Sequence, residues 1–201
     1  MNTLNNIKVI TAVILLLAIG GGYWIFKQLG ETSNYNLLSA AASGNIKEVQ
    51  DFIHSGGDIN ERFGGDGETA LHRAATNGHI KVIELLLDAG ANPNAIDADG
   101  ATPLLSASYR DQVDVVSLLL SKGANPNIAE RRYGMTPLIL AAWKGYEPTV
   151  NALLSGGADP TITAKDNNTA LSRAQAEGHI KIVDQLRAVI SKKGTVIKEG
   201  E

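Results

Sequence analysis

A period of about 33 residues constrains this chain more than any other feature of its sequence. Thr69, Thr102, Thr136 and Thr169 follow one another at steps of 33, 34 and 33 residues, and each stands near the start of a similar segment. The segments read GETALHRAATNGHIKVIELLLDAGANPN, GATPLLSASYRDQVDVVSLLLSKGANPN, GMTPLILAAWKGYEPTVNALLSGGADPT and NNTALSRAQAEGHIKIVDQLRAVISKKG. A degenerate copy, YNLLSAAASGNIKEVQDFIHSGGDIN, begins at Tyr35. Units of this size cannot bury their apolar faces alone, so we expect them to stack in a row.

Each copy has the apolar spacing of two short helices. Leu71, Ala74 and Ala75 mark the first helix of one copy, and Ile83 and Leu86 mark its second helix. The periodic threonines are expected to fix the start of each first helix through their hydroxyls. A residue in the left-handed conformation should end the first helix, and the residues at that place are Gly78, Asp111, Gly145 and Gly178. The second helix should end in the same way at Gly57, Gly90, Gly123 and Gly157.

These segments resemble the ankyrin repeat, whose hallmarks are G-x-T-P-L-H, A-A-x-x-G-H, V-V-x-L-L-L and G-A-x-x-N. The resemblance covers about 155 residues in five copies. It implies an all-α repeat solenoid, in which each helix-turn-helix unit is joined to the next by a projecting finger loop. We assign the repeat domain to residues 35–191, with repeats at 35–63, 64–98, 99–131, 132–164 and 165–191.

The two ends of the array depart from the internal pattern. Leu85 of an internal copy becomes Asp51 in the first copy and Gln185 in the last, and the last copy also introduces Arg187 in place of a leucine. Polar residues on a face without a further neighbour are typical of capping repeats, so we expect five repeats to be the whole set. The polar tail at residues 192–201 is expected to fray.

The N-terminal part of the chain contains an apolar run without a charge, VITAVILLLAIGGGYWIF, at residues 9–26. A helix of this length spans about 27 Å, close to the thickness of the hydrocarbon core of a bilayer. Tyr23 and Trp24 lie near its end, where aromatic rings favour the membrane interface. The sequence therefore predicts a single-pass transmembrane helix acting as a signal-anchor, with a short flank at residues 1–8 and a linker at residues 27–34.

A cleaved signal peptide is the alternative to this anchor, since Val9 to Ile19 would serve as its apolar region and Gly20 and Gly22 as small residues near a cleavage site. Apolarity that resumes as YWIF and a single preceding lysine favour the anchor. We expect the short N-terminus to stay inside and the repeats to be exported, so that the domain is periplasmic or otherwise extracytoplasmic. Repeats on the cytoplasmic face are the alternative orientation.

The composition and the titratable residues argue against an enzyme and against a metal-binding protein. A formal net charge of -3 does not suit a nucleic-acid binder, and the absence of cysteine removes thiolate nucleophiles and thiolate metal ligands. His72, His79 and His179 recur at fixed places of the repeat, so we expect them to make turn and inter-repeat hydrogen bonds. We therefore predict a protein that is not an enzyme and that uses neither a cofactor nor a metal ion.

The residues that the repeat fold does not require are the candidates for binding a partner. The ankyrin resemblance implies that ligands contact the finger tips and the exposed ends of the first helices. Trp, Tyr and Arg dominate binding hot spots, and they gather at these positions in the third and fourth repeats. The alternative is that the tryptophan packs along its own finger and that the arginines are merely solvated. The predicted partner-binding residues are Arg62, Phe63, Tyr109, Arg110, Arg131, Arg132, Tyr133, Met135, Trp143 and Lys144.

Charge is divided between the early and the late repeats. The early fingers carry the acidic residues Asp66, Glu68, Asp97 and Asp99. The later repeats carry the basic residues Arg110, Arg131, Arg132, Lys144 and Lys165. We therefore predict a monomeric, membrane-tethered module that binds a protein with an acidic patch, as an immunity or accessory protein for an envelope or secreted protein. The alternative is a passive structural spacer or assembly scaffold in the membrane.

Overall fold

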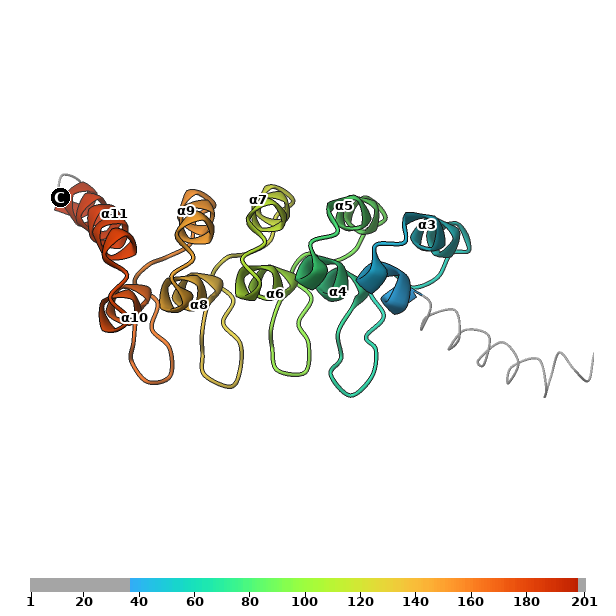
Figure 1. Cartoon of the computed structure of the whole chain (residues 1–201), viewed down its shortest axis with the longest axis horizontal. Helices are drawn as coiled ribbons and strands as arrows, with labels where there is room; N and C mark the ends of the chain where they lie inside the picture. Colours follow the sequence, from blue (N-terminus) through green and yellow to red (C-terminus); the bar gives the residue numbers. More distant parts are fainter. Residues whose placement is uncertain (1–36, 199–201) are drawn as a thin grey trace, which may run out of the picture.

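The computed structural model describes residues 37–198, which form a row of helix pairs (Figure 1). The first helices lie side by side in one layer, the second helices in another, and the fingers project beyond the first layer. Residues 37–43 are helical and precede the first labelled helix. The labelled helices are α3 (Ile46–His54), α4 (Ala70–Asn77), α5 (Ile80–Asp88), α6 (Pro103–Tyr109), α7 (Val113–Ser121), α8 (Pro137–Lys144), α9 (Glu147–Ser155), α10 (Ala170–Ala176) and α11 (Ile180–Lys198).

The predicted all-α solenoid is confirmed for the described residues, with one helix pair in each predicted repeat. The predicted transmembrane segment at residues 9–26 lies outside the described residues. Within residues 37–198, no helix is both long enough and apolar enough to cross a bilayer.

The periodic threonines begin the first helices as predicted. Thr102 Oγ1 accepts a hydrogen bond from the amide of Leu105 at 3.2 Å, and Thr136 Oγ1 accepts one from the amide of Ile139 at 3.3 Å. Such a cap satisfies an amide that has no partner within the helix, and typically stabilises a protein by about 1 kcal/mol. Asp111 has φ 54°, so an aspartate takes the left-handed position after α6, as predicted.

The first repeat differs from the prediction at Gly57. The residue with a left-handed backbone after α3 is its neighbour Gly56, with φ 75°. Gly57 is required for a different reason, since a Cβ atom there would lie 2.2 Å from Cζ of Phe52. The prediction was wrong by one residue because both positions are glycine and the period of the repeat does not separate them.

The core runs along the whole array as a repeated set of small apolar side chains. Leu71, Leu104 and Leu138 occupy the same position in three consecutive repeats, and all three are fully buried. Burying a leucine stabilises a fold by about 1.5 to 3 kcal/mol relative to leaving it exposed. Because every repeat contributes the same set, the solenoid gains its stability from contacts between neighbours.

Hydrogen bonds between neighbouring fingers hold the loops in register. The amide of Ala98 donates to the carbonyl of Asp66 at 2.7 Å, and the amide of Lys165 donates to the carbonyl of Tyr133 at 2.9 Å. The amide of Arg131 makes the equivalent bond in the middle of the array. The fingers therefore form one connected wall beside the first helices.

Asparagine side chains make a second ladder near the ends of the second helices. Asn60 Oδ1 accepts a hydrogen bond from the amide of Asn92 at 2.7 Å, while its Nδ2 donates to the carbonyl of Gly90 at 3.1 Å. Asn94 repeats this pair of bonds to the next turn of the array. Each asparagine thus joins two consecutive repeats through backbone groups.

The C-terminal end of the array extends further than predicted. Helix α11 continues to Lys198, so that part of the tail expected to fray at residues 192–201 is helical. Arg187 of the last repeat is exposed, as is Asp51 of the first repeat. Both polar residues therefore lie where a capping repeat needs them.

Candidate functional site: a groove across the middle repeats

A groove with a volume of about 840 Å³ lies between the fingers and the first helices of the third, fourth and fifth repeats. We call it the groove throughout. The fingers form one wall, and helices α6, α8 and α10 form its base and its other side. Its lining residues are Asp97, Asp99, Ala101, Leu105, Tyr109, Glu130, Arg132, Tyr133, Met135, Leu140, Trp143, Asp166 and Arg173.

The floor of the groove is apolar. Leu105 of α6 and Leu140 of α8 line it together with Ala101 and Met135. Leu105 and Leu140 are almost fully buried, yet they lie apart from the contiguous core between the two helix layers. An apolar surface at the bottom of a groove gains free energy when a ligand covers it.

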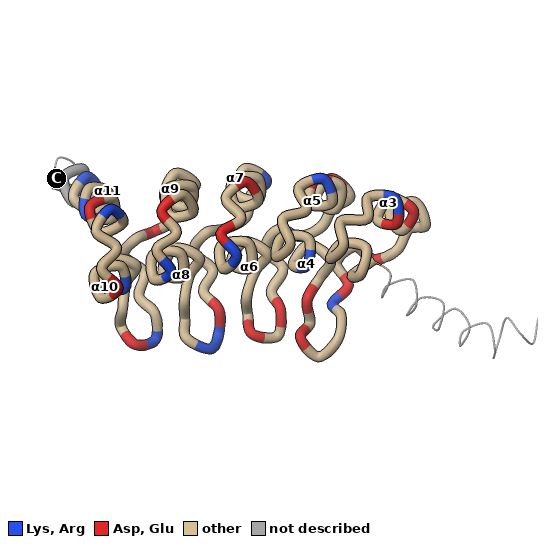
Figure 2. The backbone as a smooth tube through the Cα atoms, in the orientation of Figure 1, with Lys and Arg blue, Asp and Glu red and all other residues tan. Residues whose placement is uncertain are grey.

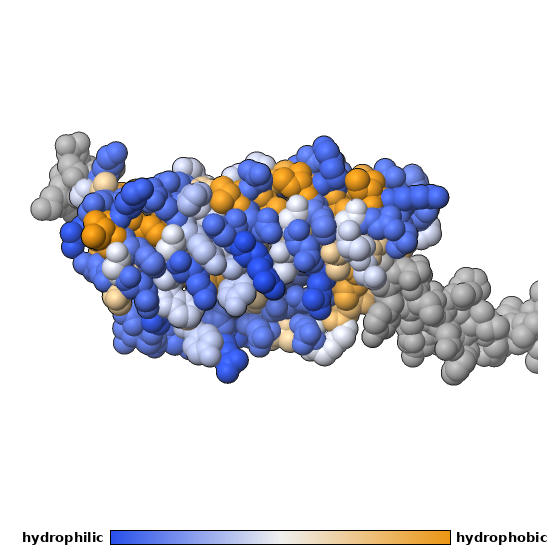
Figure 3. Space-filling view, viewed as in Figure 1, coloured by the Kyte–Doolittle hydropathy of each residue, from blue (hydrophilic) through white to orange (hydrophobic). Residues whose placement is uncertain are grey.

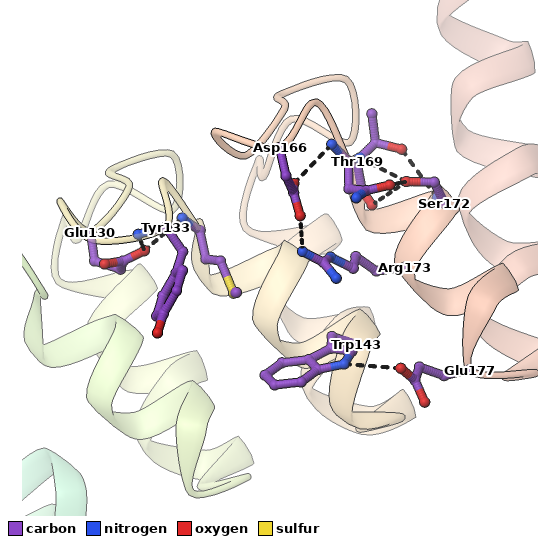
Figure 4. A network of polar contacts seen from close by, with 10 residues as sticks. Glu130, Tyr133, Trp143, Asp166, Thr169, Ser172, Arg173 and Glu177 are labelled. Atoms are coloured by element: carbon purple, nitrogen blue, oxygen red, sulfur yellow. Dashed lines mark hydrogen bonds and ion pairs between the residues drawn. The ribbon is translucent and has the colours of Figure 1, made fainter.

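Three aromatic side chains stand around this floor. Tyr109 ends α6 and Tyr133 projects from a finger, with 50% and 52% of their surfaces exposed. Trp143, near the end of α8, is half-buried, and its Nε1 donates a hydrogen bond to Glu177 Oε1 at 3.1 Å (Figure 4). Because Glu177 belongs to the next repeat, the indole is held across the repeat boundary and does not lie along its own finger.

Cationic side chains lie over these rings. The Lys144 ammonium lies 4.7 Å from the ring centroid of Trp143 and 5.6 Å from that of Tyr109. The guanidinium of Arg132 lies 5.1 Å from the ring centroid of Tyr133, and Arg110 contacts Tyr109 in the same way at 5.7 Å. These distances fall within the range of cation–π attraction. The rim of the groove therefore combines large rings with positive charge.

The finger that carries Tyr133 is shaped by one carboxylate. Glu130 Oε1 accepts hydrogen bonds from the amides of Tyr133 at 2.8 Å and Met135 at 3.0 Å. Its Oε2 accepts one from the amide of Arg132 at 2.5 Å. Figure 4 shows the Glu130 carboxylate inside this loop and the Tyr133 ring pointing away from it. The bonds fix the loop and so hold Arg132 and Tyr133 in position.

The carboxylates on the fingers differ in their hydrogen-bond and ion-pair partners. Asp97 Oδ1 accepts a hydrogen bond from the amide of Ala101 at 2.8 Å. Asp166 forms an ion pair with Arg173, and hydrogen bonds from Asn168 hold the pKa of Asp166 below its usual value. The exposed carboxylate of Asp99 has no hydrogen-bond or ion-pair partner among the described residues. Asp99 is thus the lining carboxylate that is most available to a ligand.

The predicted contact residues separate into those in the groove and those beside it. Five of them line it: Tyr109, Arg132, Tyr133, Met135 and Trp143. Arg110 and Lys144 lie on its rim through their contacts with the rings. The structure therefore brings seven of the predicted residues together in one place.

The other three predicted contact residues lie outside the lining of the groove and make structural contacts. Arg131 Nη1 donates to the carbonyl of Ala98 at 3.2 Å and so joins two fingers. Arg62 Nε donates to the carbonyl of Gly67 at 3.1 Å within its own finger. Phe63 differs most from the prediction, since its side chain is only 8% exposed. Its backbone bridges to Glu68 in the first finger, and its buried ring offers little surface to a partner.

Sequence reasoning missed the floor of the groove and the ion pair at its end. A signal was present four residues after each periodic threonine. The second and fifth repeats have arginine there, whereas the third has a serine and the fourth a leucine; in chain order these residues are Arg73, Ser106, Leu140 and Arg173. The change from a cation to a small or apolar side chain marks the third and fourth repeats, which form the middle of the groove, while Arg173 of the fifth repeat lines its end.

The histidines have the structural roles predicted for them. The Nδ1 atom of the buried His72 ring accepts a hydrogen bond from the amide of Thr69 at 3.2 Å, and its Nε2 lies 3.0 Å from the carbonyl oxygen of Ala101. Burial lowers the pKa of His72. His79 and His179 bond to carbonyls of the preceding repeats. Within the described part of the chain, no three His, Asp or Glu side chains are grouped closely enough to hold a metal ion.

An ion pair replaces the groove in the second repeat. Arg73 Nε lies 2.6 Å from Glu68 Oε2, and Arg73 has the same position in its repeat as Arg173, which pairs with Asp166. The pKa of Glu68 is nevertheless raised, because burial outweighs the attraction of Arg73 and the nearby Asp97 adds repulsion.

Comparisons with known proteins agree with this architecture. A family model described as ankyrin repeats in three copies matches residues 37–130, and a second, described as ankyrin repeats in many copies, matches residues 110–154. Zinc finger CCCH domain-containing protein 50 of Oryza sativa subsp. japonica is 39% identical over 87 residues, which are 41% of this chain and 13% of that protein.

Two further relatives show the same limited overlap. Potassium channel AKT1 of Oryza sativa subsp. indica is 43% identical over 63 residues, which are 31% of this chain and 6% of the channel. Ankyrin repeat domain-containing protein 40 of Mus musculus is 43% identical over 56 residues, which are 28% of this chain and 15% of that protein. The chain thus matches a small part of the length of each of these relatives.

Proposed function

The chain belongs to the ankyrin repeat proteins, and from this premise we propose that the groove is its binding site for a protein partner. Ankyrin repeats are in general protein–protein interaction modules. The observation that carries the proposal is the pair of half-exposed rings, Tyr109 and Tyr133, beside an apolar floor. The scaffold does not need these rings, whereas an interface gains most from buried aromatic side chains. The module acts by binding and not by catalysis.

The positive charges on the rim support a partner with an acidic patch. Arg110, Arg132 and Lys144 form no ion pair with a carboxylate in the part of the chain that the structure describes. Their charges are held in place by contacts with the rings, so an approaching carboxylate meets cations that are already ordered. Charges of this kind chiefly raise the association rate and set the orientation of the partner.

We further propose that residues 9–26 tether the module to a membrane and that the repeats lie on the exported side. The support comes from the uncharged run itself and from the aromatic residues at its end. Tethering would raise the local concentration of the repeats near a partner in the same envelope. An immunity or accessory role for an envelope or secreted protein fits such an arrangement. A passive spacer is the competing function, and it predicts that the groove tolerates substitution.

The deciding experiment is capture of the partner with the full chain in detergent. The test variant is Tyr133→Ala/Trp143→Ala, and the matched control is Ile46→Ala/Ile180→Ala, which removes two exposed apolar side chains away from the groove. Circular dichroism checks that all three proteins have the same helicity. Loss of two hot-spot residues is expected to weaken binding by at least about 30-fold, or about 2 kcal/mol.

A protein retained by the wild type and the control but lost by the test variant supports the proposal and identifies the partner. Capture of the same proteins by all three would contradict it. The search would then move to the row of second helices, over which apolar atoms gather on the face shown in Figure 3.

A further inference from the structure

The charges around the groove change sign from one side of it to the other. On the finger side, Asp97 and Asp99 line the groove beside the third repeat. On the opposite side, Arg110 caps the end of α6 and Lys144 is the last residue of α8. Figure 2 shows this arrangement as red on the finger below α6 and blue at the ends of the two helices. Between the two charged margins lies the apolar floor.

Each side also carries one residue of the opposite sign. Arg132, on the finger side, has its guanidinium over the ring of Tyr133. Glu177, on the helix-end side, accepts the hydrogen bond from Trp143. On the finger side, Glu130 is also occupied, by three backbone amides, and Asp166 by Arg173. Arg132 keeps its positive charge, but the finger side of the lining also carries the carboxylates of Asp97, Asp99, Glu130 and Asp166, so its balance is acidic. Arg110 and Lys144 make the side at the helix ends basic.

The length of helix α6 gives the scale of the floor between the two margins. Helix α6 has seven residues, which span about 10 Å. In an extended peptide, alternate residues point to the same side, and positions i and i+4 are about 13 Å apart with i+2 midway. Three side chains on one face of an extended segment therefore match the acidic margin, the apolar floor and the basic margin.

We propose that the partner places an extended segment across the groove, with an apolar residue on Leu105 and Leu140. A basic residue two positions to one side of it contacts Asp97 and Asp99. An acidic residue two positions to the other side contacts Arg110 and Lys144. This inference rests on the proposed function and specifies the chemistry of its partner. The acidic residue belongs to the acidic patch already inferred, whereas the basic residue is an additional requirement. Charge complementarity along the segment also fixes its direction in the groove.

The test uses synthetic peptides with the full chain in detergent micelles, so that the partner need not be known. The two probe peptides are Ac-GESLSKG-NH2 and its reverse order, Ac-GKSLSEG-NH2. Three controls change one property each: Ac-GESSSKG-NH2 lacks the apolar residue, Ac-GESLSEG-NH2 lacks the base, and Ac-GKSLSKG-NH2 lacks the acid. Binding is followed by nuclear magnetic resonance through the indole signal of Trp143, assigned with a Trp143→Phe variant.

We expect one of the two probe peptides to give saturable shifts, and each control to bind at least about fivefold more weakly. In Asp99→Lys the preference should move to Ac-GESLSEG-NH2. The matched control is Asp66→Lys, which makes the same change at an exposed aspartate of the first finger, outside the groove. In Lys144→Glu the preference should move to Ac-GKSLSKG-NH2, whereas Lys47→Glu on α3 should keep the wild-type order.

Equal binding of all the peptides, no saturable shift with either probe, or the same change in Asp66→Lys as in Asp99→Lys would each overturn the inference. The capture experiment separates this result from the proposed function. If Tyr133→Ala/Trp143→Ala loses a partner that Asp99→Lys retains with unchanged affinity, the groove binds a protein but does not select a basic residue.

Discussion

The second and fifth repeats are closed by an ion pair between the finger and the first helix, whereas the third and fourth repeats are open, and the ion pair of the fifth repeat forms the end of the groove. The difference arises four residues after the periodic threonine, at Arg73, Ser106, Leu140 and Arg173. Each arginine reaches a carboxylate of its own finger, Glu68 or Asp166. The serine and the leucine make no such bridge, and the space beside them becomes the groove. The same backbone therefore gives a closed or an open surface according to one side chain per repeat.

Placing the arginine of the outer repeats into the fourth repeat should close the groove. In Leu140→Arg the new side chain would cover the floor and bring a charge next to Arg173, so we expect partner affinity to fall by at least about 30-fold, or about 2 kcal/mol. Surface plasmon resonance with the captured partner measures this change. Leu140→Met is the matched control because it keeps an apolar side chain of similar volume. Unchanged affinity in Leu140→Arg would show that the floor takes no part in binding.

The pH dependence of stability should arise from the second repeat. Leu105 and Ile139 occupy the place of His72 in the open repeats, and Ser172 occupies it in the fifth, so the buried imidazole is particular to the second repeat. Burial lowers the pKa of His72 below 6.5, so the unfolded chain binds more protons as the pH falls. The contribution of His72 to the free energy of unfolding is complete above about pH 6.5 and declines below it, by at most about 1.4 kcal/mol per pH unit.

Urea unfolding of the full chain in detergent at pH 7.5, 6.5 and 5.5 measures this decline. In His72→Gln the amide keeps a donor and an acceptor but does not titrate, so the decline should become smaller. His54→Gln, which replaces an exposed histidine, should leave it unchanged. Glu68 acts in the opposite sense, because its raised pKa makes stability decrease as the pH rises through the pKa of its folded state. Equal slopes in all three proteins would assign the pH dependence to other groups.

Away from the groove, the junction between the first and second repeats should be equivalent to the junction between the closed second repeat and the open third repeat. Asn60 and Asn94 make the same two hydrogen bonds, one to a glycine carbonyl and one from an asparagine amide. We therefore expect Asn60→Ala and Asn94→Ala each to lower the free energy of unfolding by about 1 kcal/mol. Chemical denaturation of the two variants tests this equality. A clear difference between them would show that the junction with the first open repeat also differs in its scaffold.

The fold could be predicted because its determinants are local and periodic. The threonine caps and Asp111 each depend on a few neighbouring residues, and the period shows where they belong. Gly57 was misplaced because its role depends on the ring of Phe52, which pattern alone does not place. Helix α11 continues past the last repeated position, which the period alone does not indicate.

The site could be predicted in part, through the residues that have no scaffold duty. Tyr133 and Trp143 stand out in the sequence and lie in the groove. Leu105 and Leu140 resemble core leucines, and their place in a groove depends on how neighbouring repeats stack. Phe63 has the residue type of a contact, but the geometry of its finger buries it. Side-chain identity thus indicated the rim, whereas the floor required the structure.

The smallest expected effect concerns the bond that holds Trp143 across the boundary between an open and a closed repeat. Its Nε1 donates to the carboxylate of Glu177, the residue that caps α10. In Glu177→Gln the amide oxygen can still accept this bond but carries no charge, so we expect partner affinity to fall by no more than about 0.5 kcal/mol, or about twofold. In Glu177→Ala the bond is lost and the indole is free to turn, which should lower affinity further and broaden the Trp143 indole signal in nuclear magnetic resonance spectra. If glutamine and alanine weaken binding equally and the indole signal stays sharp, then Trp143 is positioned by its packing on the fourth repeat and the fifth repeat contributes charge alone.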